Sequence, residues 1–166
     1  MHTISINLKP YIRDYVIARF GPEPIRFSKG SDESLRLLDL LARPPAGRIN
    51  RGNTTFKLPY SDFKDPRVYN YLSENSIAIL SKYLANIFWH DFRDQMRANE
   101  RTYPGILHKD SINMFIEKYA IHPDNIEFET LKKHYYRHRK KRINHISHRN
   151  HKNHSKNHSI LFGLLA

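Results

Sequence analysis

The run of residues 76–98, SIAILSKYLANIFWHDFRDQMRA, constrains the fold more than any other part of the sequence. Apolar side chains recur three or four positions apart through this run, which is the period of an α-helix. The apolar stripe contains Ile77, Leu80, Leu84, Ile87, Phe88 and Phe92, with Ile79, Tyr83 and Met96 beside it. A stripe this wide is typical of a helix that other helices cover on several sides. We therefore expect a helical bundle with this helix at its centre.

Five further segments have helical features, and with the long helix they predict an all-α bundle of about six helices. They are residues 10–20, 32–43, 66–72, 111–120 and 126–142. Local signals mark where four of these helices begin. Pro10 suits a first helical turn, and Ser31, followed by two acidic residues, is a favourable N-cap. Asp65 and Asp110 are the expected caps of the third and fourth segments.

The region between Ser31 and Phe63 carries two more detailed expectations. Leu35, Leu38 and Leu41 form one apolar stripe, widened by neighbouring leucines, so the helix 32–43 is expected to be largely buried. The connection 44–63 is irregular and contains Pro and Gly. Its NTTFKL stretch has strand character, which allows a short hairpin within the connection.

Charge is distributed very unevenly along the chain. All 16 acidic residues lie at or before Glu129, whereas ten of the 28 Lys and Arg residues fall between Lys132 and Lys156. That segment therefore supplies +10 of the formal net charge of +12. Such polarised charge favours a polyanionic partner. Membrane binding would require large apolar residues opposite the charges, and the segment between Ile146 and Ile160 has none, so nucleic acid is the better prediction.

The last two predicted helices, within 111–142, have the outline of a helix-turn-helix. Asp124 and Glu127 stand three positions apart and resemble a capping box at the start of the second helix. A recognition helix usually presents its N-terminal residues to the bases, but here that end carries Glu127 and Glu129. The cations begin only at Lys132. The helix therefore either enters a groove by its later turns or is basic without reading a groove.

Eight side chains on this helix are the predicted nucleic-acid contacts. Cationic side chains would bind phosphates, and a tyrosine would stack or donate a hydrogen bond to the backbone. The eight are Lys132, Lys133, Tyr136, Arg137, Arg139, Lys140, Lys141 and Arg142. Duplex DNA is the favoured partner. Single-stranded RNA is an alternative, in which Tyr135 and Tyr136 would stack on unpaired bases. A helical protein-interaction module with a solubilising tail is another.

Residues 143–166 form a low-complexity tail rich in His, Lys and Asn, for which we expect disorder. His residues recur in it every third position from 145 to 154 and could chelate a metal loosely. A specific zinc site needs ligands held in tetrahedral geometry by a scaffold, so we expect no dedicated metal site.

No sequence motif predicts an enzyme or a cofactor. The chain has no cysteine, which excludes thiol chemistry and fits a reducing cytoplasm. It also lacks a phosphate-binding Gly loop and a nucleophile elbow. His90, Asp91 and Asp94 lie on one helix without ligands from a second one, and we interpret them as an exposed polar stripe.

The stretch FIEKYAIHPDNIEFETLKKHYYRHRKK, residues 115–141, together with the helices before it, resembles a family. The family consists of uncharacterised, small all-helical proteins from Bacteroides-group bacteria and their mobile elements. The resemblance covers residues 5–142 and is most recognisable from Phe128 to Lys141. It implies an all-α fold around a central helix and carries over no catalytic residues. The His-rich tail lies outside it.

Overall fold

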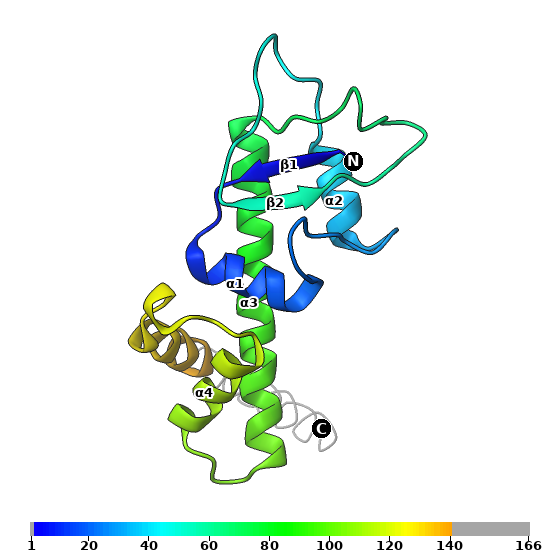
Figure 1. The fold of residues 1–166 in the computed structure, drawn as a ribbon. Helices are drawn as coiled ribbons and strands as arrows, with labels where there is room; N and C mark the ends of the chain where they lie inside the picture. Colours follow the sequence, from blue (N-terminus) through cyan, green and yellow to red (C-terminus); the bar gives the residue numbers. More distant parts are fainter. Residues whose placement is uncertain (1, 141–166) are drawn as a thin grey trace, which may run out of the picture. The chain divides into compact units, whose positions relative to one another are not determined.

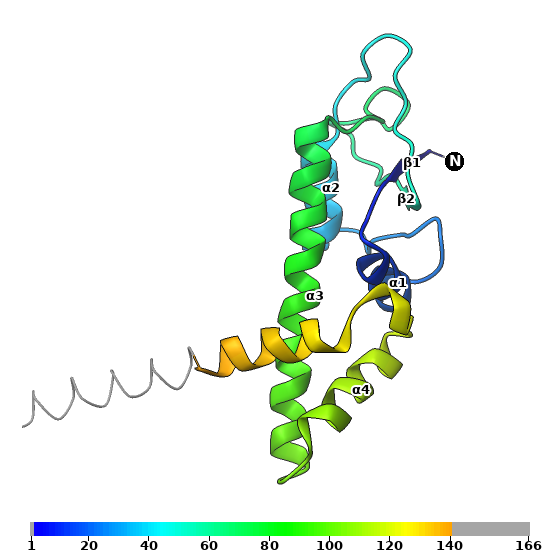
Figure 2. The same cartoon turned by 90° about the vertical axis from the view of Figure 1, so that its left-hand side faces the viewer.

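A computed structural model of the chain describes residues 2–140. The chain divides into two compact units, Met1–Glu127 and Phe128–Ala166. The described part is mostly helical and contains a small two-stranded sheet (Figures 1 and 2). None of the helices in this part is both long and apolar enough to span a lipid bilayer. The prediction of a helical fold is therefore correct for most elements, and the sheet is an addition to it.

The first unit contains, in chain order, β1 (Thr3–Ile6), α1 (Pro10–Phe20), α2 (Asp32–Leu40), β2 (Thr54–Lys57), α3 (Glu74–Thr102), α4 (His108–Lys118) and the short 3-10 helix η1 (Pro123–Asn125). In the second unit, residues 128–140 are helical. Helices α1, α2 and α4 each contact α3, which is the long green helix of Figure 1. The sheet and α2 lie beside the N-terminal half of α3, and α4 lies beside its C-terminal half (Figures 1 and 2).

Helix α3 confirms the long helix predicted at 76–98, but only one of its faces is buried, and Ile79 beside the predicted stripe is 39% exposed. It is 29 residues long, and it begins after Ser73, whose side chain accepts a hydrogen bond from the backbone N–H of Ser76. Its fully buried apolar residues are Leu80, Leu84, Phe88, Phe92 and Met96. This regular spacing places one continuous face of α3 in the core, against α1, α2 and α4.

Helices α1 and α2 begin where the sequence predicts, but α2 buries a different face. α1 starts at Pro10, and the side chain of Ser31 caps α2. α2 ends at Leu40, and its buried residues are Ser34 and Leu37. Leu35 is 50% exposed. The expectation of a largely buried helix with an inward stripe through Leu35 is therefore wrong, because a helix of nine residues contacts α3 over little more than one narrow face.

The two strands form an antiparallel pair that the sequence did not predict. Thr3 pairs with Lys57, and Ile6 pairs with Thr54. Alternate residues of both strands face the core, among them Ile6 and Phe56, which are fully buried. The strand character of NTTFKL is thus confirmed, but the hairpin within 44–63 is wrong, since the partner of β2 lies about 50 residues earlier in the chain.

The segment that follows the connection does not form the predicted helix at 66–72. The backbone N–H groups of Val68 and Tyr69 both donate to the carbonyl of Asp65, which closes a single turn. Tyr71 then forms an antiparallel bridge with Ala42 instead of continuing a helix. The N–H and C=O groups of Tyr71 bond to Ala42 and are therefore not available for helical hydrogen bonds, so the predicted helix is wrong.

Helix α4 begins at His108, before the predicted start, and Leu107 occupies its N-cap position without a side-chain hydrogen bond. Asp110 therefore lies inside the first turn, where its charge favours the helix dipole, and does not cap the helix. A buried polar contact fixes α4 on α3, because the side-chain amide of Asn99 donates to the hydroxyl of Ser111 at 2.9 Å.

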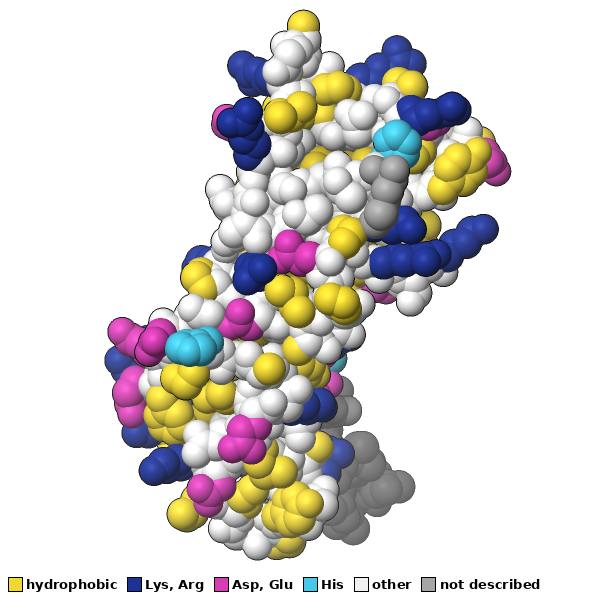
Figure 3. Space-filling view, viewed as in Figure 1, with side chains coloured by type: hydrophobic (Ala, Val, Ile, Leu, Met, Phe, Trp, Pro, Cys, Tyr) yellow, Lys and Arg dark blue, Asp and Glu magenta, His cyan; other side chains and the backbone are white. Residues whose placement is uncertain are grey.

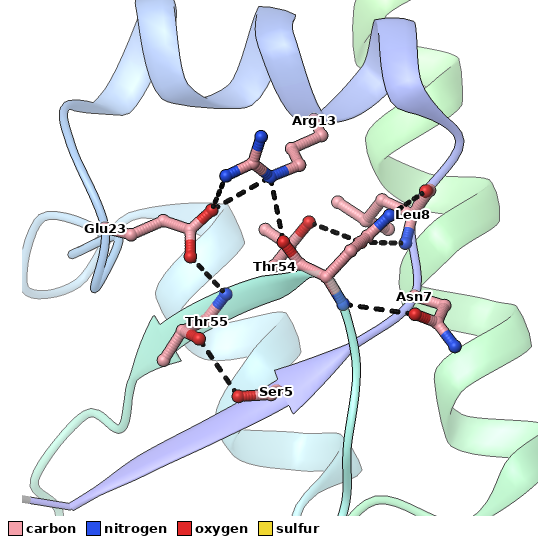
Figure 4. A network of polar contacts seen from close by, with 8 residues as sticks. Ser5, Asn7, Leu8, Arg13, Glu23, Thr54 and Thr55 are labelled. Atoms are coloured by element: carbon pink, nitrogen blue, oxygen red, sulfur yellow. Dashed lines mark hydrogen bonds and ion pairs between the residues drawn. The ribbon is translucent and has the colours of Figure 1, made fainter.

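A polar network fixes the sheet on α1 (Figure 4). Arg13 of α1 pairs with Glu23 at 2.8 Å and also donates to the backbone carbonyl of Asn53. The other carboxylate oxygen of Glu23 accepts the backbone N–H of Thr55. The side chain of Asn53 exchanges two hydrogen bonds with the backbone of Leu8. Segments far apart in the sequence are thereby held together at the end of β1.

Candidate nucleic-acid interface

The helix that carries the predicted contacts begins at residue 128, two positions later than expected. Ile126 is extended, so Asp124 cannot serve as the N-cap of a helix that contains Glu127. The capping-box prediction is therefore wrong. Asp124 belongs instead to η1, whose first turn is capped by the imidazole of His122, which accepts the backbone N–H of Asp124.

The helix 128–140 is amphipathic, and one of its faces is exposed and basic. Lys133, Tyr136, Arg137 and Lys140 are all exposed. Their spacing of three and four positions places them on a single face. We call these four residues the basic stripe. The opposite face carries Leu131 and Tyr135, which are buried.

Two further predicted contacts, Lys132 and Arg139, are half-buried and lie together along one edge of the basic stripe. The ammonium of Lys132 lies 3.0 Å from the carboxylate of Glu129, one turn earlier. Exposed ion pairs of this kind contribute less than about 1 kcal/mol to stability. Lys132 can therefore leave Glu129 and bind a phosphate with little loss of free energy. Glu129 lies in the first turn, where its negative charge favours the helix dipole.

Lys141, Arg142 and the His-rich tail 143–166 lie outside the described residues. Six of the eight predicted contacts are therefore placed on one described helix, and two are not placed. The pairing of this helix with α4 as a helix-turn-helix concerns two separate units of the chain and stays a prediction.

The two tyrosines of this helix differ in exposure. Tyr136 is 44% exposed, whereas Tyr135 is only 5% exposed. Their ring centroids lie 5.7 Å apart at an interplanar angle of 57°. A pair of rings that both stack on unpaired bases, as the RNA alternative expects, is therefore wrong, and Tyr136 alone offers an exposed ring.

The exposed polar stripe expected at His90, Asp91 and Asp94 is found for His90 and Asp94, whose side chains are 63% and 44% exposed, but not for Asp91, whose side chain is 18% exposed. The carboxylate of Asp91 accepts hydrogen bonds from the hydroxyls of Tyr15 at 2.7 Å and Tyr119 at 3.2 Å. Asp94 is exposed and pairs with an arginine one turn further along α3. Among residues 2–140, no three His, Asp or Glu side chains gather closely enough to hold a metal ion. Asp91 therefore joins α1 and α3 to the end of α4.

Comparison of the chain with protein-family models, with curated proteins and with solved structures finds no match. The resemblance to the Bacteroides-group family stays a prediction.

Proposed function

We propose that this chain binds nucleic acid, with duplex DNA as the preferred form, and that it does so without catalysing a reaction. The basic stripe, Lys132, Arg139 and the cations that follow them supply the contacts. The observation that carries the proposal is the basic stripe itself, which gathers three cations and a tyrosine on one exposed helix face. No acidic residue follows Glu129, so nothing later in the sequence repels phosphate.

The length of the basic stripe suits contact with a phosphate backbone. Lys133 and Lys140 are seven positions apart, which corresponds to about 10 Å along a helix that rises about 1.5 Å per residue. Along one DNA strand, phosphates follow one another at about 3.4 Å along the duplex axis. Three cations can therefore contact neighbouring phosphates at the same time. Backbone contacts of this kind position a protein on DNA but carry little sequence information.

The N-terminal turn of this helix is unsuited to reading bases. Glu129 lies on the same side of the helix as Lys133, and its carboxylate would repel phosphates. Contact through the later turns is therefore favoured. The resemblance to a family that includes mobile-element proteins extends the proposal to replication or regulation of such an element.

The proposal is tested by reversing three charges of the basic stripe in the full chain, with Lys133→Glu, Arg137→Glu and Lys140→Glu. A control variant carries Lys82→Glu, Arg101→Glu and Lys109→Glu, which change the net charge by the same amount at exposed positions of α3 and α4. The affinity for a short fluorescent duplex is measured by anisotropy at several salt concentrations. We expect the slope of log affinity against log salt to become shallower by about 3 in the first variant, since each phosphate contact contributes about 0.9.

The control variant separates a local interface from a general effect of charge. We expect it to keep the slope of the unaltered chain. Equal losses in the two variants would mean that only the net charge matters, and no loss in the first variant would remove the basic stripe from the interface.

A further inference from the structure

The first unit contains a groove that the sequence did not predict, and it lies apart from the basic stripe in the chain. Its volume is about 590 Å³, within the range of about 300–1,000 Å³ that holds small ligands. One wall consists of the segment before α2 and α2 itself, with Arg26, Lys29 and Leu35. The other wall is the end of β2, with Lys57, and the segment that follows it, with Tyr60 and Phe63.

Two aromatic rings in this groove are exposed. Tyr60 is 73% exposed and Phe63 is 94% exposed. Neither ring makes a ring contact with another residue of the described chain. Large exposed apolar side chains that occur together, with polar residues around them, mark binding surfaces more often than isolated ones do. A planar group of a ligand can therefore stack on these rings.

The backbone around these rings is fixed at both ends. Before them, Lys57 donates its backbone N–H to Ile25, and Leu58 donates to His2. After them, the ammonium of Lys64 donates to three backbone carbonyls at the C-terminal end of α2, those of Leu38, Asp39 and Leu41. The segment 59–63 is thus a strap held between β2 and α2, and its rings are exposed on a fixed support.

The base of the groove is apolar and rigid. Phe27 and Leu58 line it and are buried. The ring of Phe27 packs between Phe20 at 5.0 Å and Phe56 at 5.6 Å. A ligand would therefore meet a preformed surface, which reduces the ordering that binding requires.

The charge of the groove is positive. Its lining contains Arg26, Lys29 and Lys57 but only one acid, Asp62. None of these three cations pairs with an acid among residues 2–140. Figure 3 shows Lys and Arg side chains next to hydrophobic ones over the end of the first unit that contains the sheet. Exposed rings beside unpaired cations are the combination that single-stranded nucleic acids require, because bases stack on the rings and phosphates bind the cations.

We propose that this groove binds single-stranded nucleic acid, with unpaired bases stacked on Tyr60 and Phe63 and with phosphates at Arg26, Lys29 and Lys57. A duplex cannot use the site in this way, because its bases are already stacked on one another. The site shares no residue with the basic stripe, and the two proposals stand or fall independently. An acidic peptide would use the cations but would gain little from two flat rings.

The test measures the binding of the full chain to a fluorescent oligothymidylate and, in parallel, to a short duplex. One variant carries Tyr60→Ala and Phe63→Ala, whose exposed side chains contribute little to the core. A matched control carries Tyr103→Ala and Leu107→Ala, two exposed apolar residues of the loop between α3 and α4. We expect the first variant to bind the oligothymidylate at least about tenfold more weakly and to bind the duplex unchanged, because each stacked base contributes substantially to affinity. The control should bind both as the unaltered chain does.

A cross-linking experiment identifies the residues that contact the oligonucleotide. An oligonucleotide that contains 4-thiothymidine is cross-linked to the unaltered chain by light, and the modified peptide is identified by mass spectrometry. Cross-links within 57–63 support the groove. The proposal is overturned if the oligothymidylate binds both double variants equally, if it does not bind at low salt, or if cross-links fall only in 128–142. It is also overturned if polyglutamate displaces the oligothymidylate from the unaltered chain and from the Tyr60 and Phe63 variant equally well.

Discussion

Replacement of Asp91 by alanine should destabilise the first unit far more than its place in the polar sequence WHDFRD suggests. Asp91 lies on α3, and its side chain is only 18% exposed. It accepts hydrogen bonds from Tyr15 of α1 and from Tyr119 at the end of α4, and it pairs with Arg19. One carboxylate thereby joins three helices of the unit.

The size of the effect follows from what each partner loses. Tyr15 is fully buried, and burial raises the pKa of its hydroxyl, so this group stays protonated and needs an acceptor. Leaving a buried donor without an acceptor costs about 1–3 kcal/mol. Tyr119 and Arg19 are partly exposed and can turn to water, so each adds less than about 1 kcal/mol. We expect Asp91→Ala to lower the free energy of unfolding by about 2–4 kcal/mol.

Asp94→Ala is the matched control on the same helix. Asp94 is 44% exposed, and its pairing with Arg97 is solvent-accessible, so its loss should cost less than about 1 kcal/mol. Both variants are unfolded in urea and followed by circular dichroism and by the fluorescence of Trp89, the single tryptophan. A difference of less than about 0.5 kcal/mol between the two variants, which is the usual range for surface substitutions, would show that Asp91 does not join the three helices.

Three further predictions concern other parts of the first unit. A Cβ atom on Gly52 would lie 2.0 Å from the carbonyl carbon of Ile6, so Gly52→Ala should cost about 3 kcal/mol in urea unfolding. Lys64→Met removes the ammonium from the end of α2 and should lower the melting temperature by about 2–6 °C, with unchanged melting counting against this role. Hydrogen bonds from Arg67 lower the pKa of Asp65 to about 2, so any stability from this carboxylate is present above its ordinary pKa of about 4 and is lost as the pH falls toward 2. Arg67→Ala should raise the Asp65 midpoint in an NMR titration.

The elements that the sequence predicts best are those fixed by local signals. Pro10 at the start of α1, Ser31 at the start of α2 and the long apolar stripe of α3 each act within a few residues, and each is correct. The strand pair could not be predicted, because Thr3–Ile6 is too short to show a period and finds its partner about 50 residues later. Leu35 shows the same limit, since the face that a short helix buries depends on its tertiary neighbours.

Of the two candidate binding sites, the basic stripe can be predicted from the sequence and the groove cannot. Helical spacing places Lys133, Arg137 and Lys140 on one face without any knowledge of the fold, because positions three and four apart are neighbours on a helix. The groove depends on a contact between two segments about 30 residues apart, and nothing local indicates it. The nearest signal was the pair of aromatic residues Tyr60 and Phe63 in a connection with little apolar periodicity.

Whether the helix that begins at residue 128 binds DNA is tested by comparing the full chain with a chain that stops after Arg142. Anisotropy of a short fluorescent duplex is measured for both across a range of salt concentrations. If the helix that begins at residue 128 is the DNA-binding element, the shortened chain should still bind, with a slope of log affinity against log salt of about −4 or steeper. If binding disappears with the tail, or if neither chain binds at low salt, the basic stripe is not a nucleic-acid interface and the claim is contradicted.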